Sequence, residues 1–271
     1  MMKIEKLDEK SKEKLREYLL RDFSKNAIYL YDLDREYPTR ADFSIALEDN
    51  KIKGFSVIWA DNPDFCYLHI IAEDENVFSN LFNMSENSFD KVRRLIVPSE
   101  FSPIVTKRLG INGIPMYLAN LKKGEEKLSV KHDVRILYKK DMEDIKKLIS
   151  EAIETHIHDE RIGRGIINSI EKSLDWELLF GCYIDNELAS FIRATISYPP
   201  IAMIDTLYTR QNFRNRGAAM STESGIIREL FYNRNIFNEV QLYEEKNNIP
   251  AYNLHKKIGF RVLKDYMRFS L

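Results

Sequence analysis

The feature that most constrains the fold of this chain is an internal repeat: its 271 residues contain the same succession of segments twice. Each half opens with a short alternating segment that leads into apolar residues at helical spacing. The sequences are KIEKLDEKSKEKLREYL in the first half and VRILYKKDMEDIKKLI in the second, where Asp141 is a candidate helix N-cap. Because a repeat identifies the unit that folds, we expect two copies of one fold.

Further matches follow in the same order. Asp49-Asn50 and Asp185-Asn186 each separate two apolar strands and supply the turn residues of a hairpin. A third strand follows in each half, CYLHIIAE in the first and IAMIDTLYT in the second. The segments IVTKRLGI and NLHKKIGF are expected to be helices that end at a glycine and precede a final strand. The segment 120–131, charged and poor in apolar residues, is expected to link the copies.

The two copies differ in length between the hairpin and the last helix. Asn50 and Asn186 are 136 residues apart, whereas Gly110 and Gly259 are 149 residues apart. The second copy therefore carries a net 13 extra residues between its third strand and its last helix. This stretch contains QNFRNRGAAMSTESG, the most chemically informative part of the chain.

Residues Arg214–Ala219, with the sequence RNRGAA, follow the predicted strand and open a predicted helix. The start of a helix presents unpaired N–H groups and a positive dipole end, which together bind anions. Gly217 permits a positive φ and close approach of the backbone, and Ala219 leaves room for a phosphate. Three basic side chains surround this turn: Arg210, Arg214 and Arg216. The motif alone also fits an ordinary turn with solvated arginines.

A second motif lies in NNIPAYNLHKKIGF, where Asn247 or Asn248 is expected to cap a helix that contains Pro250 in its first turn. The helix is expected to end at Gly259. His255 falls on its inward, apolar face. A histidine in such a position is either a packed core residue or a functional one.

Together the two motifs resemble those of the GNAT superfamily of acyl-CoA-dependent N-acyltransferases. The Q/R-x-x-G-x-G/A loop of that family is matched by Arg214, Gly217 and Ala219. Its N-x-x-A-x-x-x-Y-x-x-x-G-F helix is matched by Asn248, Ala251, Gly259 and Phe260. The segment VRILYKKDMEDIKKLI also looks like the first strand and helix of the family. The resemblance covers about 140 residues from Asp133 to the C-terminus, and the first half is similar in outline only.

The resemblance implies a fold of the α/β (α+β) class with two GNAT-like domains, each a mixed, mostly antiparallel sheet flanked by helices. Residues 131–271 would bind acetyl-CoA as a co-substrate. Residues 1–125 would be a degenerate copy without the coenzyme loop, since no basic glycine loop precedes Thr106, the counterpart of His255.

The implied coenzyme contacts are of three kinds. Amides of the basic turn would hold the diphosphate, the end of the third strand would follow the pantetheine arm, and a backbone N–H there would polarise the thioester carbonyl. The residues are Leu207, Tyr208, Thr209, Arg214, Asn215, Arg216, Gly217, Ala218, Ala219 and Asn248.

The catalytic positions depart from the family pattern. The frequent tyrosine general acid is replaced by His255, whose imidazolium is a competent acid near neutral pH. The frequent glutamate base aligns with Met203, and Asp205, two residues later on the same strand face, could take the proton through a water. Asp205 could equally be structural, Glu244 is a second candidate base, and an amine that arrives unprotonated needs none.

Other residues carry weaker signals. His156 and His158 have no metal-ligand spacing, so no metal is expected; they either line the acceptor pocket or end a helix at the surface. Trp176, Tyr198 and Pro199-Pro200 are expected in the core and in a turn.

The composition of the chain limits the classes of molecule that it is expected to bind. The 41 basic and 42 acidic residues cancel, so attraction of the whole surface to nucleic acid or a membrane is not expected. Two distant cysteines and the absence of a signal-like or bilayer-length apolar run predict a cytoplasmic protein. The expected partner is a small-molecule or peptide amine that accepts the acyl group; the acyl chain length stays open. The alternative is an acyl-CoA-binding sensor without turnover.

Overall fold

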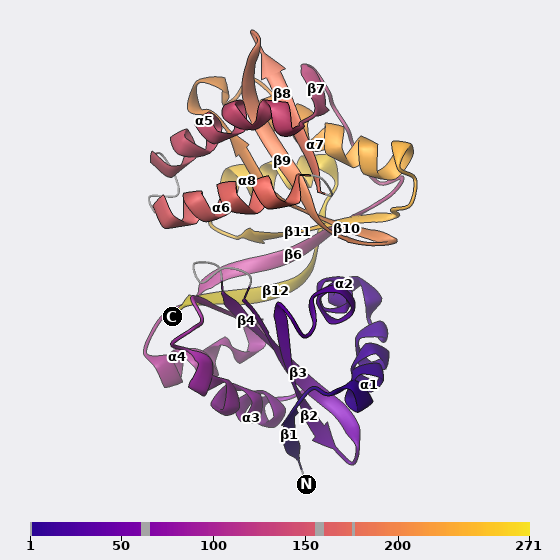
Figure 1. Ribbon diagram of the computed structural model, residues 1–271, viewed down its shortest axis with the longest axis vertical. Helices are drawn as coiled ribbons and strands as arrows, with labels where there is room; N and C mark the ends of the chain where they lie inside the picture. The colour runs from indigo at the N-terminus through magenta and orange to yellow at the C-terminus, as the bar shows by residue number, and fades with distance from the viewer. Residues whose placement is uncertain (1, 61–65, 155–159, 175–176) are drawn as a thin grey trace. The chain divides into compact units, whose positions relative to one another are not determined.

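The computed structural model describes residues 2–60, 66–154, 160–174 and 177–271, and these divide into two compact units (Figure 1). The N-terminal unit contains Met1–Leu118, Glu245–Asn247 and Leu263–Leu271. The C-terminal unit contains Ala119–Glu244 and Asn248–Val262. Each unit has its own set of strands and its own helices.

The sheet of the N-terminal unit has the strand order β1-β2-β3-β4-β5-β12. Its strands are β1 (Lys3–Lys6), β2 (Ala41–Glu48), β3 (Lys51–Trp59), β4 (Tyr67–Ala72), β5 (Arg94–Pro98) and β12 (Arg261–Ser270). Every neighbouring pair is antiparallel except β4 with β5, which is parallel. Figure 1 shows helices on both sides of this sheet: α1 (Glu9–Leu20), α2 (Phe23–Tyr31), α3 (Glu75–Ser85) and α4 (Ser102–Leu109).

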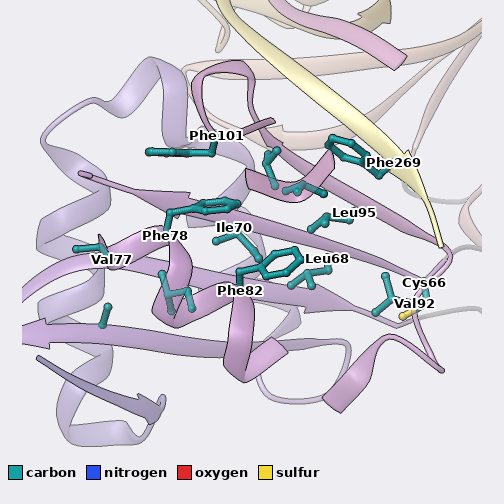
Figure 2. Packing of buried hydrophobic residues seen from close by; sticks show 14 residues of the cluster. Cys66, Leu68, Ile70, Val77, Phe78, Phe82, Val92, Leu95, Phe101 and Phe269 are labelled. Atoms are coloured by element: carbon teal, nitrogen blue, oxygen red, sulfur yellow. The ribbon is translucent and has the colours of Figure 1, made fainter. Parts of the chain in front are cut away.

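The core of this unit is rich in phenylalanine (Figure 2). The rings of Phe78 and Phe101 stack with their centroids 4.6 Å apart, and Phe82 and Phe269 are also buried. Phe269 comes from β12, the last strand of the chain. The core of the N-terminal unit is therefore completed by residues from the other end of the sequence.

The sheet of the C-terminal unit has the strand order β6-β11-β10-β9-β8-β7. Its strands are β6 (Ile114–Lys122, from Ala119 on), β7 (Asp133–Ile136), β8 (Leu178–Ile184), β9 (Glu187–Tyr198), β10 (Ile201–Thr209) and β11 (Glu239–Glu245). The β10–β11 pair is parallel, and the β7–β8, β8–β9 and β9–β10 pairs are antiparallel. The helices are α5 (Met142–Ala152), α6 (Glu160–Ser173), α7 (Ala218–Arg228) and α8 (Ile249–Ile258).

Side chains of β8 alternate between two cores, as the period of a strand requires. Leu179 packs with Ile145, Leu148 and Ile170 of α5 and α6. Cys182 packs in a second cluster with Phe213 and Ala218, at the start of α7. The sheet is therefore covered on both faces, and the turn before α7 is anchored in a core of its own.

The expected fold class is confirmed in both units: each contains a mixed, mostly antiparallel sheet flanked by helices. The repeat is visible in the backbone. Asp49-Asn50 and Asp185-Asn186 have positive φ in their hairpin turns, and Gly110 and Gly259 end α4 and α8 in the left-handed conformation.

The two compact units do not follow chain order at the last strand. Tyr266–Ser270 of β12 pair with Arg94–Pro98 of β5, so Leu263–Leu271 belong to the N-terminal unit. The expected domains, 1–125 and 131–271, depart from the compact units there. The segment expected as a linker also belongs to the C-terminal unit, where Ser129 N and Lys131 N donate to hydroxyls of α7.

Candidate functional site

The connection from β10 to α7 is a well-anchored turn. A short 3₁₀ turn over Gln211–Phe213 follows β10, and the Phe213 ring is buried. Asn215 and Gly217 then adopt positive φ values of 59° and 88°. Two left-handed residues within a few positions bend the chain sharply and turn its amides outward. The expected strand, basic turn and helix are all present.

The first amides of α7 are free of any side-chain cap. The helix begins after Gly217, which has no side chain to cap it, and its first described internal bond runs from Ser221 N to Gly217 O at 3.0 Å. The amides of Ala218 and Ala219 precede that bond, so the helix leaves them for another acceptor. A Cβ at Gly217 would have no described atom closer than 3.8 Å, the distance to His132 Nε2. A side chain there would only touch His132 and Lys131 at ordinary van der Waals distance, so the backbone at Gly217 is not crowded.

The three arginines around the turn have different surroundings. Arg210 is bound by Glu151 at 2.8 Å and by Glu187 at 3.1 Å. Burial alone would raise the pKa of Glu151, but the hydrogen bonds from Arg210 and Gln211 N and the charges of Arg210 and Arg214 together hold that pKa below its usual value. Gln211 N also donates to Glu151, so this ion pair ties the turn to α5. Arg210 is structural and adds little charge for a ligand.

Arg214 and Arg216 keep most of their donors for a ligand. Arg214 donates from Nε to Thr209 O at 3.1 Å, and its guanidinium lies 5.8 Å from the centre of the Tyr208 ring. Arg216 pairs with Asp185 at 3.2 Å in a contact where both side chains are largely exposed. An exposed pair of this kind contributes at most about 1 kcal/mol, so a phosphate could replace it.

The end of β10 carries a β-bulge. Asp205 pairs with Arg193 of β9, and the next paired residue is Tyr208, which lies opposite Phe191. Thr206 and Leu207 therefore leave the regular ladder together, and Thr206 has a φ of 54°. A positive φ is strained for a β-branched residue and persists only where the surroundings enforce it. The bulge redirects the backbone at the position expected to polarise the thioester.

Asp205 lies in a hydrogen-bond network that includes Thr206. Its carboxylate accepts from Arg193 Nε at 2.6 Å, from Thr195 Oγ1 at 3.1 Å and from Thr206 Oγ1 at 2.7 Å. Arg193 also donates to Ser169 at 3.1 Å. With its oxygens engaged in this way, Asp205 fits the structural alternative better than the role of a general base.

His255 is buried between two carboxylates. Its Nδ1 lies 2.9 Å from Oε1 of Glu223 on α7, and its Nε2 lies 3.8 Å from Oε2 of Glu244 on β11. Burial alone would lower the pKa of His255, but the charge of Glu223 and hydrogen bonds to both carboxylates raise it to about 9. The imidazole is therefore protonated at neutral pH and has an N–H on each side.

Glu223 is a residue that the sequence pattern did not single out. It is fully buried, and it lies three and four positions before Ile226 and Ile227 on the apolar stripe of α7. A carboxylate on a buried stripe is a sequence signal in itself, because it requires a partner in the folded protein.

Asn248 is the N-cap of α8; the sequence left Asn247 and Asn248 as alternatives for this position. Its side chain accepts from Ala251 N at 3.5 Å, and its amide donates to Glu244 at 3.3 Å. Asn248 therefore places Glu244 next to the start of the helix that carries His255. His156, His158 and Trp176 lie outside the described residues.

The N-terminal unit has a different arrangement at the equivalent place. Only Glu73 and Asp74 connect β4 to α3, and Asp74 caps α3 by accepting from Val77 N at 2.9 Å. Glu75 adds a second carboxylate to the first turn. The start of α3 thus holds a negative charge of its own, which opposes binding of a phosphate. This geometry favours the expectation that the first copy binds no coenzyme.

The described residues show neither a membrane span nor a metal cluster. Their helices include none with the length and apolar character required to cross a bilayer. They also contain no group of three or more His, Cys, Asp or Glu side chains arranged to hold a metal ion.

Comparison with known proteins identifies a family for the C-terminal unit. Residues 143–260 match the sequence model described as Acetyltransferase (GNAT) family. No curated protein shows significant sequence similarity to the chain.

Several solved structures share the fold over the whole chain. A GCN5-related N-acetyltransferase from Sphaerobacter thermophilus has a TM-score of 0.68 at 11% identity, covering 99% of this chain and 95% of its own. A tandem GNAT protein from the clavulanic acid biosynthesis pathway has a TM-score of 0.64 at 9% identity, covering 100% and 98%. A Drosophila protein has a TM-score of 0.71 at 12% identity, covering 99% and 98%. At these identities the similarity shows the fold alone.

Proposed function

Because residues 143–260 belong to the GNAT family of acetyltransferases, we propose that the C-terminal unit transfers an acetyl group from acetyl-CoA to an amine. The observation that carries this proposal is the start of α7 behind Gly217, which has no side-chain cap and lies beside Arg214 and Arg216. A diphosphate there would accept from the amides of Ala218 and Ala219 and neutralise the arginines.

The bulge of β10 supplies the second part of the site. The coenzyme brings an activated thioester, and its pantetheine arm would follow Leu207–Thr209. A backbone N–H at Leu207 or Tyr208 would donate to the thioester carbonyl as negative charge develops on its oxygen. Because the side chain of Thr206 is hydrogen-bonded to Asp205, this donor would be held in place before the substrate binds.

The reaction proposed is direct attack by the amine. The amine nitrogen forms a bond to the carbonyl carbon, the C–S bond breaks, and the sulfur keeps its electron pair. His255 would give that sulfur a proton, and the attacking nitrogen would lose a proton to water. Correct placement of the two reactants supplies most of the rate, and acid assistance adds a factor on the order of 10²–10⁴.

The test of the coenzyme site introduces a negative charge at the start of α7. Ala219→Glu and Gly217→Glu should weaken binding of CoA at least tenfold, measured by calorimetry, while the circular dichroism spectrum stays unchanged. An added carboxylate would compete for the same amides and repel the diphosphate.

Gly110→Glu is the matched control. Gly110 also has a positive φ and open space around it, but it lies at the end of α4 in the N-terminal unit. This variant suffers the same backbone strain and should bind CoA normally. If Ala219→Glu binds CoA as tightly as the unchanged protein, the assignment of the turn is wrong.

A second candidate function is an acyl-CoA sensor without turnover. It is favoured by the engagement of Asp205 with Arg193, which makes Asp205 a weaker candidate for the general base. Calorimetry with acetyl-CoA, combined with an assay of thiol release over a broad set of small-molecule and peptide amines, separates the two. Binding without thiol release from any amine would support the sensor.

A further inference from the structure

Burial of the Glu223 carboxylate costs free energy when the C-terminal unit folds. Its side chain is 0% exposed, and one oxygen, Oε1, meets His255 Nδ1 at 2.9 Å. The other oxygen, Oε2, is buried and has no hydrogen-bond partner among the described residues. A buried ion pair with an unsatisfied oxygen stabilises a fold less than well-packed apolar side chains would. Stability alone does not account for it.

The neighbours of Glu223 on α7 show that the pair is enclosed on that side. Ser221, Thr222 and Ser224 are all 0% exposed. Ser221 and Ser224 accept from backbone amides of segment 129–131, and Thr222 donates to Ala218 O. These hydroxyls have partners of their own, so His255 is the described partner of the carboxylate.

Side-chain exposure increases from Glu223 through His255 to Glu244. The exposed fraction is 0% for the side chain of Glu223, 7% for that of His255 and 21% for that of Glu244. The inner ring nitrogen of His255 therefore faces the closed interior, and the outer one faces the more open side. The ring of Phe260 contacts the imidazole edge to face, at 5.6 Å between centroids, and limits its rotation.

The charges around His255 come from three elements. Glu223 faces it from α7 and Glu244 from β11, whereas Lys256 and Lys257 on α8 itself are exposed. Glu125, in the segment beside the end of α8, is paired with Arg261. Two carboxylates thus act on one imidazole.

We propose that Glu223 is a positioning residue: it keeps His255 as an imidazolium and directs Nε2–H outward, to the sulfur that leaves in the reaction. This inference rests on the proposed acetyl transfer. In the step itself the C–S bond breaks, the sulfur keeps the electron pair, and the proton on Nε2 moves to it. His255 is left neutral, with Nδ1–H still donated to Glu223, and regains its proton from solvent past Glu244.

The pKa of the proton donor, His255, and that of the leaving thiol are close enough for this transfer. The two carboxylates raise the pKa of His255 to about 9 against the effect of burial, which is close to the value of about 8.5 for an ordinary thiol. A general acid works best when it is protonated at the working pH and still releases its proton in the transition state. Without Glu223, burial would lower the pKa of the ring and only Glu244 would oppose that effect.

The experiment changes the charge of Glu223 and keeps its shape. In Glu223→Gln we expect the NMR titration of the His255 imidazole to move down by at least one pH unit. The alkaline limb of the pH profile of kcat/KM, followed by thiol release from acetyl-CoA, should move down by the same amount. The Kd for CoA should stay within threefold, because Glu223 is not part of the turn that binds the diphosphate.

Glu239→Gln is the matched control, because Glu239 is a buried carboxylate of the same unit that accepts from Gln241. It should leave both the titration and the profile in place. The unchanged protein provides a test that needs no variant: His255 should titrate near pH 9, and a titration at or below the ordinary 6.5 overturns the inference.

The outcomes separate the two proposals. If the His255 titration moves in Glu223→Gln and the pH profile does not, Glu223 is only a structural partner and the inference is wrong. If Ala219→Glu still binds CoA, the proposed function fails whatever Glu223 does. If the unchanged protein binds CoA but releases no thiol with any amine, there is no leaving sulfur for His255 to protonate and this inference is overturned too.

Discussion

The charge of His255 also affects the stability of the fold, in a direction that follows from its pKa. The folded value of about 9 lies above the ordinary 6.5, so the stabilisation is complete below pH 6.5 and is lost as the pH rises through 9. A shift of this size corresponds to on the order of 3 kcal/mol. His69 in the N-terminal unit behaves in the opposite way, because burial lowers its pKa to about 4 and stability is lost as the pH falls below 6.5.

We therefore expect the melting temperature of the unchanged protein to fall between pH 6.5 and 9 more steeply than that of His255→Gln, which cannot titrate there. The comparison with the variant is needed because burial also raises the pKa of Asp32 to about 8, which acts in the same direction. Scanning calorimetry at half-unit pH steps measures both slopes. Equal slopes would show that folding does not raise the pKa of His255.

At the scale of single elements, the starts of α3 and α7 show how one fold can bind an anion or exclude it. Both helices follow the fourth strand of their copy, β4 and β10, but α3 is capped by Asp74, whereas α7 begins after the bare Gly217. An N-cap side chain satisfies amides that would otherwise be open to a ligand. The longer loop before α7 therefore leaves the first amides of that helix uncapped, whereas the short loop before α3 supplies a capping carboxylate.

Removal of the cap tests this comparison. Asp74→Ala should destabilise the N-terminal unit by about 1 kcal/mol, measured by denaturant unfolding, because the amide of Val77 loses its acceptor. The same change should create no second CoA site, since the turn 210–217 has no counterpart before α3. CoA binding is best measured in a Gly217→Glu background, where binding to the C-terminal site is expected to be weakened. CoA binding by the double variant would contradict the role given to that turn.

Much of this element-level architecture could be predicted from the sequence, and the limits have physical reasons. The turn at Gly217 and the helix ends at Gly110 and Gly259 were predictable, because glycine and small residues report local backbone conformation. The bulge at Thr206 was not, since a β-branched residue favours regular strand and the side-chain contacts of Thr206 with Asp205 and Arg193 are not visible in the local sequence. The pairing of Glu223 with His255 joins positions 32 apart, which no local pattern encodes.

At the scale of the whole molecule, the pairing partner of the last strand is the feature that the order of segments in the sequence did not predict. The repeat predicted the existence of the final strand, but strand partners depend on register and tertiary packing rather than on local sequence. The structure pairs this strand with β5 and places Phe269 in the core of the N-terminal unit. The C-terminal residues therefore serve a unit that is mostly built from the first half of the chain.

Phe269→Ala tests this assignment. Truncation of a buried phenylalanine costs about 3–5 kcal/mol, and the loss should fall on the N-terminal unit, where hydrogen exchange of the amides of Arg94–Pro98 should accelerate. Phe191→Ala is the matched control, because Phe191 is equally buried but belongs to the core of α5 and α6. It should accelerate exchange in β8 and leave β5 protected. If Phe269→Ala instead loosens β8 first, the last strand belongs with the C-terminal unit, as chain order alone would suggest.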